Sequence, residues 1–205
     1  MKPRNIVLAS NSPRRKALLE QLRLPFKAVP TFVDESRNVS ENAKNLVERI
    51  SEKKARSVEV EDDSLIIAAD TVINLKEKIF GKPFSKEDGF LMLRELSGKV
   101  HKVHTGVCMV LNKNREIFSV QTDVYFRELT DEMIDWYWSL DESKDKAGSY
   151  AIQEWIGIIG IKWIKGSYFN VMGLPTEKVY SELIKFSDDE KKGWEQKIPD
   201  CKICW

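Results

Sequence analysis

Hydrophobic and polar positions follow two different periods along the first half of the chain. Ile6–Ala9 and Ser64–Asn74 are nearly continuous apolar runs, which is typical of buried strands. Between them, apolar residues recur at helical spacing from Glu41 to Val58 and predict a long helix with Ser40 as its cap. A shorter helix is expected over Pro13–Leu22. Strands and helices therefore alternate here, as in an α/β protein.

The pattern changes near Val100. Two alternating segments around a short polar turn predict an antiparallel hairpin, and Thr130 is expected to begin a helix that ends near Leu140. The remaining expected elements are two extended segments, Tyr150–Gln153 and Ile156–Ile164, and a helix, Thr176–Phe186. Together these elements predict an α/β fold in which a mixed, twisted sheet has flanking helices. We expect one domain over residues 1–186 and a polar C-terminal tail over residues 187–205.

Composition and charge narrow the classes of function. The 205 residues include 33 Lys and Arg against 32 Asp and Glu, so the net charge is near zero. This balance argues against a protein that follows nucleic acid by neutralising its phosphates. No apolar run approaches the roughly 20 residues of a membrane span. The three cysteines do not form a disulfide framework, and a reduced, cytoplasmic enzyme or binding domain is expected.

The stretch Leu8–Lys16 (LASNSPRRK) places three cations at the start of a helix. Ser12 is a good N-cap and Pro13 suits the first helical position. Each cation in the first turn faces the positive end of the helix dipole, at a cost of about 0.3–1 kcal/mol. The pattern is explained if an anion such as phosphate binds there, held by the backbone N–H groups, the hydroxyls of Ser10 and Ser12, and two guanidiniums.

Asp70 follows the apolar run Leu65–Ala69, so a buried carboxylate is expected there. Such a group needs a hydrogen-bond network, a cation or a metal, and a simple cap through Thr71 is an equal alternative. Glu35, in an acidic loop, would be a second ligand for a divalent metal. Lys54 and Lys82 are candidates for neutralising a phosphate; Lys82 is the better placed, between Gly81 and Pro83.

Taken in order, these stretches resemble the Maf family of nucleotide pyrophosphatases. The similarity covers about Ile6 to Phe186, and the tail lies outside it. The matching stretches are LASNSPRRKALLEQL, FVDE, EKKAR, AADTVI, GKP, SGKVHKVHTGV, FRELTDEMIDWY, KAGSYAIQ and GSYFNVMGLP.

The resemblance implies an elongated, two-lobed α/β fold with a central cleft, a homodimer in many members, and a need for Mg²⁺ or Mn²⁺. It implies hydrolysis of a nucleoside triphosphate to the monophosphate and pyrophosphate. Asp70 matches the proposed general base or metal ligand, and Glu35 matches the acidic-loop residue near the metal. The phosphate-contacting positions correspond to Ser10, Arg14, Arg15, Lys54 and Lys82.

Three positions, Arg14, Thr71 and Gln153, resemble the branch of the family that prefers dTTP and UTP. At the position after Gln153, where that family is expected to have glycine, this chain has Glu154 followed by Trp155, and their bulk is expected to narrow the base pocket. The alternatives are a non-catalytic, nucleotide-binding regulator of cell division and a 7-methyl-GTP pyrophosphatase. The intact Asp70 favours an enzyme over the regulator.

Overall fold

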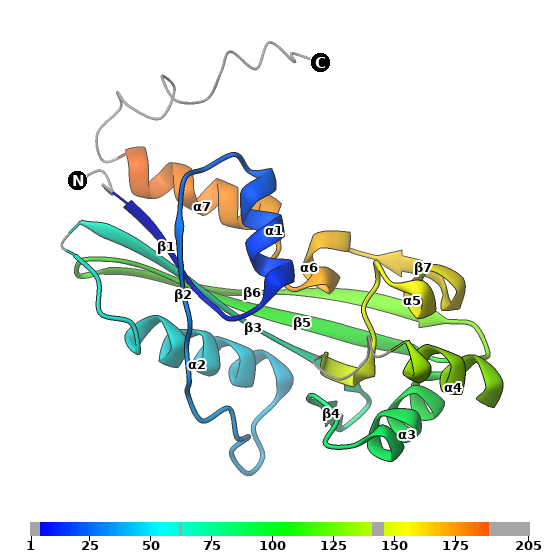
Figure 1. The fold of residues 1–205 in the computed structure, drawn as a ribbon. Coiled ribbons are helices and arrows are strands. Elements are labelled where there is room, and N and C mark those ends of the chain that lie inside the picture. The colour runs from blue at the N-terminus through cyan, green and yellow to red at the C-terminus, as the bar shows by residue number, and fades with distance from the viewer. Residues whose placement is uncertain (1–4, 62, 141–145, 189–205) are drawn as a thin grey trace.

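The computed structural model describes residues 5–61, 63–140 and 146–188 (Figure 1). Its centre is a seven-stranded sheet in the order β2-β1-β3-β5-β6-β7, with β4 pairing with β3. β1 is parallel to β2 and β3, and the other pairs are antiparallel, so the predicted mixed sheet is confirmed. The strands are β1 (Asn5–Ala9), β2 (Lys27–Val29), β3 (Ser64–Leu75), β4 (Lys78–Phe80), β5 (Val100–Leu111), β6 (Asn114–Phe126) and β7 (Ile161–Lys165).

Helices cover both faces of this sheet. In Figure 1, α2 lies on one face, α1, α6 and α7 lie on the other, and α3 and α4 pack together at one end. The helices are α1 (Pro13–Gln21), α2 (Ala43–Arg56), α3 (Lys86–Leu96), α4 (Asp131–Ser139), the 3₁₀ turn η1 (Ala147–Ser149), α5 (Trp155–Gly160), α6 (Tyr168–Met172) and α7 (Thr176–Asp188). None of the helices in the described ranges is long and apolar enough to cross a membrane.

Two expected elements differ from the structure. α2 begins at Ala43 and is capped by Asn42, whose side chain accepts a hydrogen bond from Asn45 N, whereas Ser40 has a φ of 65° in the preceding turn. The expected strand over Ile156–Ile164 is wrong in its first half, which forms helix α5. A short apolar run fits a buried helix as well as a strand, so periodicity does not separate them.

Two other segments also differ from expectation. Tyr150–Gln153 is irregular rather than extended. The final helix continues to Asp188, two residues past its predicted end at Phe186. The rest of the predicted tail, residues 189–205, lies outside the described residues.

Alternation along β3 sends successive side chains to different packing layers. Leu65, Ile67 and Ala69 belong to the cluster under α1 and α7. The even-numbered Ile66 and Ala68 lie on the face that carries α2. A separate cluster lies around α3 and α4 at the far end of the sheet. This arrangement gives the fold two packed ends joined by the long strands.

Within the part of the chain that the structure describes, one edge of β3 has no strand beside it over a short stretch. β1 pairs with β3 as far as Ala9 opposite Ala68, and β4 pairs with β3 from Ile73 onward. Residues 69–72 therefore lie in a gap between β1 and β4, and this gap contains Asp70 and Thr71. Asp70 and Thr71, the polar pair in the middle of β3, therefore have neither β1 nor β4 beside them.

Candidate functional site

A cavity of about 830 Å³ opens at this gap. Its wall is formed by the β1–α1 turn, the 31–37 loop, α2, β3, the segment from β4 into α3, and the loop that carries η1. Nine of the ten residues predicted from the sequence line it: Ser10, Ser12, Arg14, Arg15, Glu35, Lys54, Asp70, Thr71 and Lys82. The fold thus brings together residues that are up to 72 positions apart, from Ser10 to Lys82.

Asp70 forms a buried ion pair with Lys54. The Lys54 Nζ lies 2.7 Å from Asp70 Oδ1 and 2.8 Å from Glu35 Oε1. The Lys54 and Asp70 side chains are 8% and 10% exposed, whereas Glu35 is half-exposed. The even-numbered position of Asp70 on β3 directs it to the α2 face, where Lys54 lies on the last turn of the helix.

A glycine allows α2 to approach this closely. Gly106 on β5 is directly opposite Asp70, and a Cβ added there would lie 2.4 Å from the backbone carbonyl carbon and oxygen of Val47. Val47 and Lys54 are seven residues apart and therefore lie on the same face of the helix. The absence of a side chain at Gly106 lets Lys54 reach the carboxylate.

Burial and charge act in opposite directions on the two carboxyl groups. Burial raises the pKa of Asp70, and the nearby cations Lys54 and Arg15 only partly offset this effect. For Glu35, burial would also raise the pKa, but the charge and hydrogen bond of Lys54 outweigh it and hold the pKa below its usual range. The two pKa values are therefore shifted in opposite directions, upward for Asp70 and downward for Glu35.

Arg15 is held on the opposite side of β3. Its Nη2 donates to Thr71 Oγ1 at 3.0 Å, and its Nε donates to the carbonyl oxygen of Gly173 at 2.9 Å. A longer contact of 3.5 Å joins Nη1 to Ser10 Oγ. Thr71 is in turn hydrogen-bonded to Thr105. Thr71, at an odd-numbered position of β3, points to the face opposite Asp70. It therefore holds the Arg15 guanidinium near Asp70 from that other face of the sheet.

The remaining predicted cations and hydroxyls surround the same space. The Ser12 Oγ accepts from Arg15 N at 3.5 Å, so the predicted cap is confirmed. Ser10 is buried, Arg14 is partly exposed and Lys82 is exposed. The positive charge of Lys82 helps to lower the pKa of Glu35. Four cations and two carboxylates thus border one end of the cavity, an arrangement suited to a polyanion with a bound cation.

Gln153 is the one predicted residue that the cavity wall does not include. Its Oε1 is buried and has no hydrogen-bond partner within the described residues. Two neighbours in the same stretch, Tyr150 and Ala151, do line the cavity. The Tyr150 hydroxyl lies 2.7 Å from His101 Nε2, and burial lowers the pKa of His101 to about 4. His101 is therefore neutral at neutral pH and fixes the Tyr150 ring beside the cavity.

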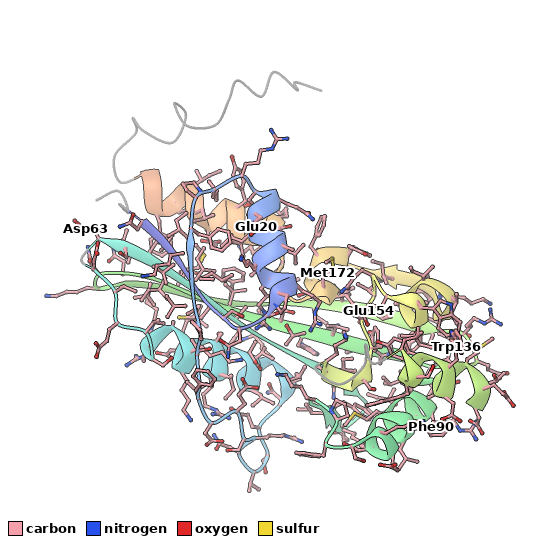
Figure 2. All side chains as sticks on the ribbon, viewed as in Figure 1. Glu20, Asp63, Phe90, Trp136, Glu154 and Met172 are labelled. Carbon is pink, nitrogen blue, oxygen red and sulfur yellow. The ribbon has the colours of Figure 1, made fainter. Side chains whose placement is uncertain are left out.

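Sequence reasoning missed a second buried ion pair on the cavity wall. Lys146 lines the cavity, and its Nζ lies 2.9 Å from Glu154 Oε1. Glu154, labelled in Figure 2 on the segment that leads into α5, is not part of the wall, so it does not narrow the cavity as expected. The only signal in the sequence was the unexpected acidic residue after Gln153.

Asp70 and Glu35 are the candidate ligands for a divalent metal at this site. Within residues 5–61, 63–140 and 146–188, no group of three or more His, Cys, Asp and Glu side chains could hold a metal ion. However, oxygens of Asp70 and Glu35 converge on one cation, the Lys54 ammonium. Mg²⁺ is commonly held by one or two carboxylates together with waters and substrate phosphates. The residues present therefore fit Mg²⁺ or Mn²⁺ that arrives with a phosphate ligand.

The chain is similar to known proteins over most of its length. A family model described as "Maf-like protein" matches residues 5–186. A dTTP/UTP pyrophosphatase of Phocaeicola vulgatus is 46% identical over 184 residues, which is 88% of this chain and 95% of the relative. A dTTP/UTP pyrophosphatase of Parabacteroides distasonis is 43% identical over 189 residues, covering 91% and 98% of the two chains. Among solved structures, a nucleoside-triphosphatase (dITP/XTP pyrophosphatase) of Mycobacterium abscessus matches with a TM-score of 0.43 and 10% identity over 91% of this chain and 98% of the other.

Proposed function

Because the chain belongs to the Maf family, we propose that it is a nucleoside triphosphate pyrophosphatase that hydrolyses dTTP and UTP to the monophosphate and pyrophosphate. The observation that carries the proposal is the end of the cavity where Asp70, Glu35 and Lys54 meet beside Arg15. Hydrolysis of a phosphoanhydride needs positioning and charge neutralisation more than covalent chemistry, and this site offers both.

In the proposed reaction, a water molecule attacks the α-phosphorus, the bond to the oxygen that bridges the α and β phosphates breaks, and pyrophosphate leaves. Asp70 accepts the proton of the attacking water, a role suited to a carboxylate whose pKa is raised by burial. Arg14, Arg15 and Lys82 neutralise the phosphate oxygens, and the hydrogen bonds from Arg15 to Thr71 and Gly173 fix its orientation.

The proposal includes a divalent metal held by Asp70 and Glu35. When bound, Mg²⁺ or Mn²⁺ would supply positive charge to the phosphates and acidify a water. Lys54, whose ammonium lies between Asp70 and Glu35, would then also be able to contact the phosphate chain. The predicted homodimer and the cytoplasmic location stay predictions.

The test is pyrophosphate release from dTTP, UTP, CTP, GTP, 7-methyl-GTP and ATP, each with Mg²⁺ or Mn²⁺. Release from dTTP and UTP is expected, and release from a purine nucleotide alone would overturn the specificity. The Asp70→Asn variant should lose turnover yet still bind α,β-methylene-UTP, whose α–β bridge is not hydrolysed. Binding without turnover in the unchanged protein would instead support the nucleotide-binding regulator.

A further inference from the structure

The second ion pair, between Lys146 on the cavity wall and Glu154 behind it, buries two charged side chains. Lys146 is 7% exposed, and the side chain of Glu154 is 18% exposed. Glu154 also accepts a hydrogen bond from the hydroxyl of Tyr137, at 2.6 Å, and Tyr137 is completely buried. A buried ion pair recovers its desolvation cost only when its geometry is good and further hydrogen bonds satisfy it. Here the Lys146 ammonium contacts the Glu154 carboxylate, which in turn accepts from the Tyr137 hydroxyl. The ammonium lies at the cavity, and the phenol lies behind the carboxylate.

The loop that carries Lys146 meets the cavity wall at two points. Gly148 in the same loop packs against Ile73, whose Cδ1 would lie 2.4 Å from a Cβ at Gly148, and Gly148 N donates to Gly81 O. Along β3, the three residues from Asp70 to Ile73 span about 10 Å. Because Gly81 precedes Lys82, this loop borders the phosphate-binding end on one side and the wall at Ile73 on the other. A nucleoside whose phosphates lie beside Asp70 would extend along the wall that carries Lys146.

The walls on the Ile73 side suit a base rather than a phosphate. They are mostly apolar and come from the core cluster at the far end of the sheet: Ile73, Phe80, Met92, Val103 and Tyr150. Binding sites of this kind combine apolar walls with a few placed polar groups that determine specificity. The Lys146 ammonium is a polar group of that kind. It has three N–H donors, and the Glu154 carboxylate accepts from one of them within the described residues.

Building on the proposed function, we infer that Lys146 reads the pyrimidine base by donating a hydrogen bond to the O4 carbonyl that thymine and uracil share. Glu154 and Tyr137 are positioning residues that hold the ammonium in place. Cytosine carries an amino group at this position, which is a donor and leaves the ammonium without an acceptor. A site built to hydrogen-bond one substrate group discriminates strongly against an analogue that lacks it.

The test compares three substrates: UTP, CTP and ribose 5-triphosphate, which has no base. In Lys146→Met, kcat/KM for UTP should fall by about 10–100-fold, the scale of one hydrogen bond to a charged group. The loss should lie mainly in KM, and the values for CTP and ribose 5-triphosphate should stay the same. Lys146→Arg should recover part of the preference for UTP. The matched control is Lys86→Met, which removes an exposed lysine paired with Asp135 and should change none of the three values.

The positioning residues provide a second test. Glu154→Gln and Tyr137→Phe should lower the UTP-to-CTP ratio in the same direction as Lys146→Met, by smaller factors. If Lys146→Met does not fold, as judged by its thermal melt, these two variants test the inference. An equal loss on all three substrates would mean that Lys146 contacts phosphate or acts structurally, and an unchanged ratio would mean that it does not contact the base. Either result would overturn the inference.

The contact between Lys146 and the base can be tested separately from the pyrophosphatase activity. Titration calorimetry with α,β-methylene-UTP and α,β-methylene-CTP measures base preference without turnover. If the protein binds the uridine analogue better and Lys146→Met removes that difference, the base contact holds even when no pyrophosphate is released. If turnover is present but the difference in binding is absent, the inference fails and the proposed function stands.

Discussion

Replacing Lys54 by methionine removes the ammonium from between two carboxylates without a large change in side-chain length. The Lys54 and Asp70 side chains are 8% and 10% exposed, and their charged atoms lie 2.7 Å apart. Removing one partner of a buried ion pair typically costs about 3–5 kcal/mol, because the other charge is left uncompensated. Arg15 still offsets part of the Asp70 charge. We therefore expect Lys54→Met to lower the free energy of unfolding at pH 8 by about 3 kcal/mol, the lower end of that range.

The loss should depend on pH in a defined direction. Burial already raises the pKa of Asp70, and Lys54 opposes this, so the variant should raise the pKa further. A carboxyl whose pKa is higher in the folded than in the unfolded state binds protons more readily when folded. Its cost to stability is absent below the unfolded pKa and grows as the pH rises through the folded pKa. The effect of Lys54→Met should therefore be clearly smaller at pH 5 than at pH 8.

Urea unfolding followed by tryptophan fluorescence at both pH values measures these effects. The matched control is Lys44→Met, on the same helix, where an exposed lysine pairs with Glu48; it should change stability by less than about 0.5 kcal/mol. In an Asp70→Asn background, Lys54→Met should cost much less, because the buried charge is gone. A loss below about 1 kcal/mol at pH 8, or equal losses at the two pH values, would refute the assignment of a buried ion pair.

Three further changes test other parts of the structure. Gly106→Ala should destabilise the fold by about 3 kcal/mol or more, because the new Cβ would lie 2.4 Å from the backbone of Val47; an unchanged melting temperature would show that α2 is free to move away. Arg14→Ala should raise KM for UTP by about tenfold or more, the scale of one charge-assisted contact, without changing the melting temperature; an unchanged KM would show that this guanidinium is only solvated. Chelation by EDTA should abolish pyrophosphate release, and added Mg²⁺ or Mn²⁺ should restore it; full activity in EDTA would remove the metal from the roles of Asp70 and Glu35.

The phosphate-binding end of the site is predictable from the sequence because its signals are local. Ser12 and Pro13 mark a helix start directly after a buried strand, and Asp70 interrupts an apolar run. The cations in the first turn of that helix and the carboxylate of Asp70 conflict with their surroundings unless a ligand or partner is present, and this conflict is visible without coordinates. The sequence does not show that Lys54 is the partner of Asp70, because that contact depends on how closely α2 approaches Gly106.

The other end of the cavity depends on tertiary contacts. Tyr137 lies on α4, whereas Lys146 and Glu154 lie on the segments that lead into η1 and α5, and no periodic pattern connects the three. Glu154 is noticeable in the sequence only as an unexpected acidic residue, and its bulk suggests a narrower pocket. In the structure it lies behind the wall, because Lys146 and Tyr137 hold it there.

Local rules also misplace the α2 cap, since Ser40 and Asn42 are both good cap residues and the chain turns between them.

The parallel pairing of β1 with β3 determines when during folding the molecule becomes able to bind its ligand. β5 and β6 are joined by a two-residue turn and form a local hairpin. In contrast, Asn5 of β1 pairs with Ser64 of β3, and these two residues are separated by nearly a third of the chain. Contacts between distant segments form slowly, because a long loop must first be closed. Arg15 follows β1 and Asp70 lies on β3, so the phosphate-binding end exists only after this pairing is made. A chain with its hairpin complete but β1 not yet docked therefore has no site for a triphosphate, and a bound nucleotide stabilises the last step of folding rather than the first.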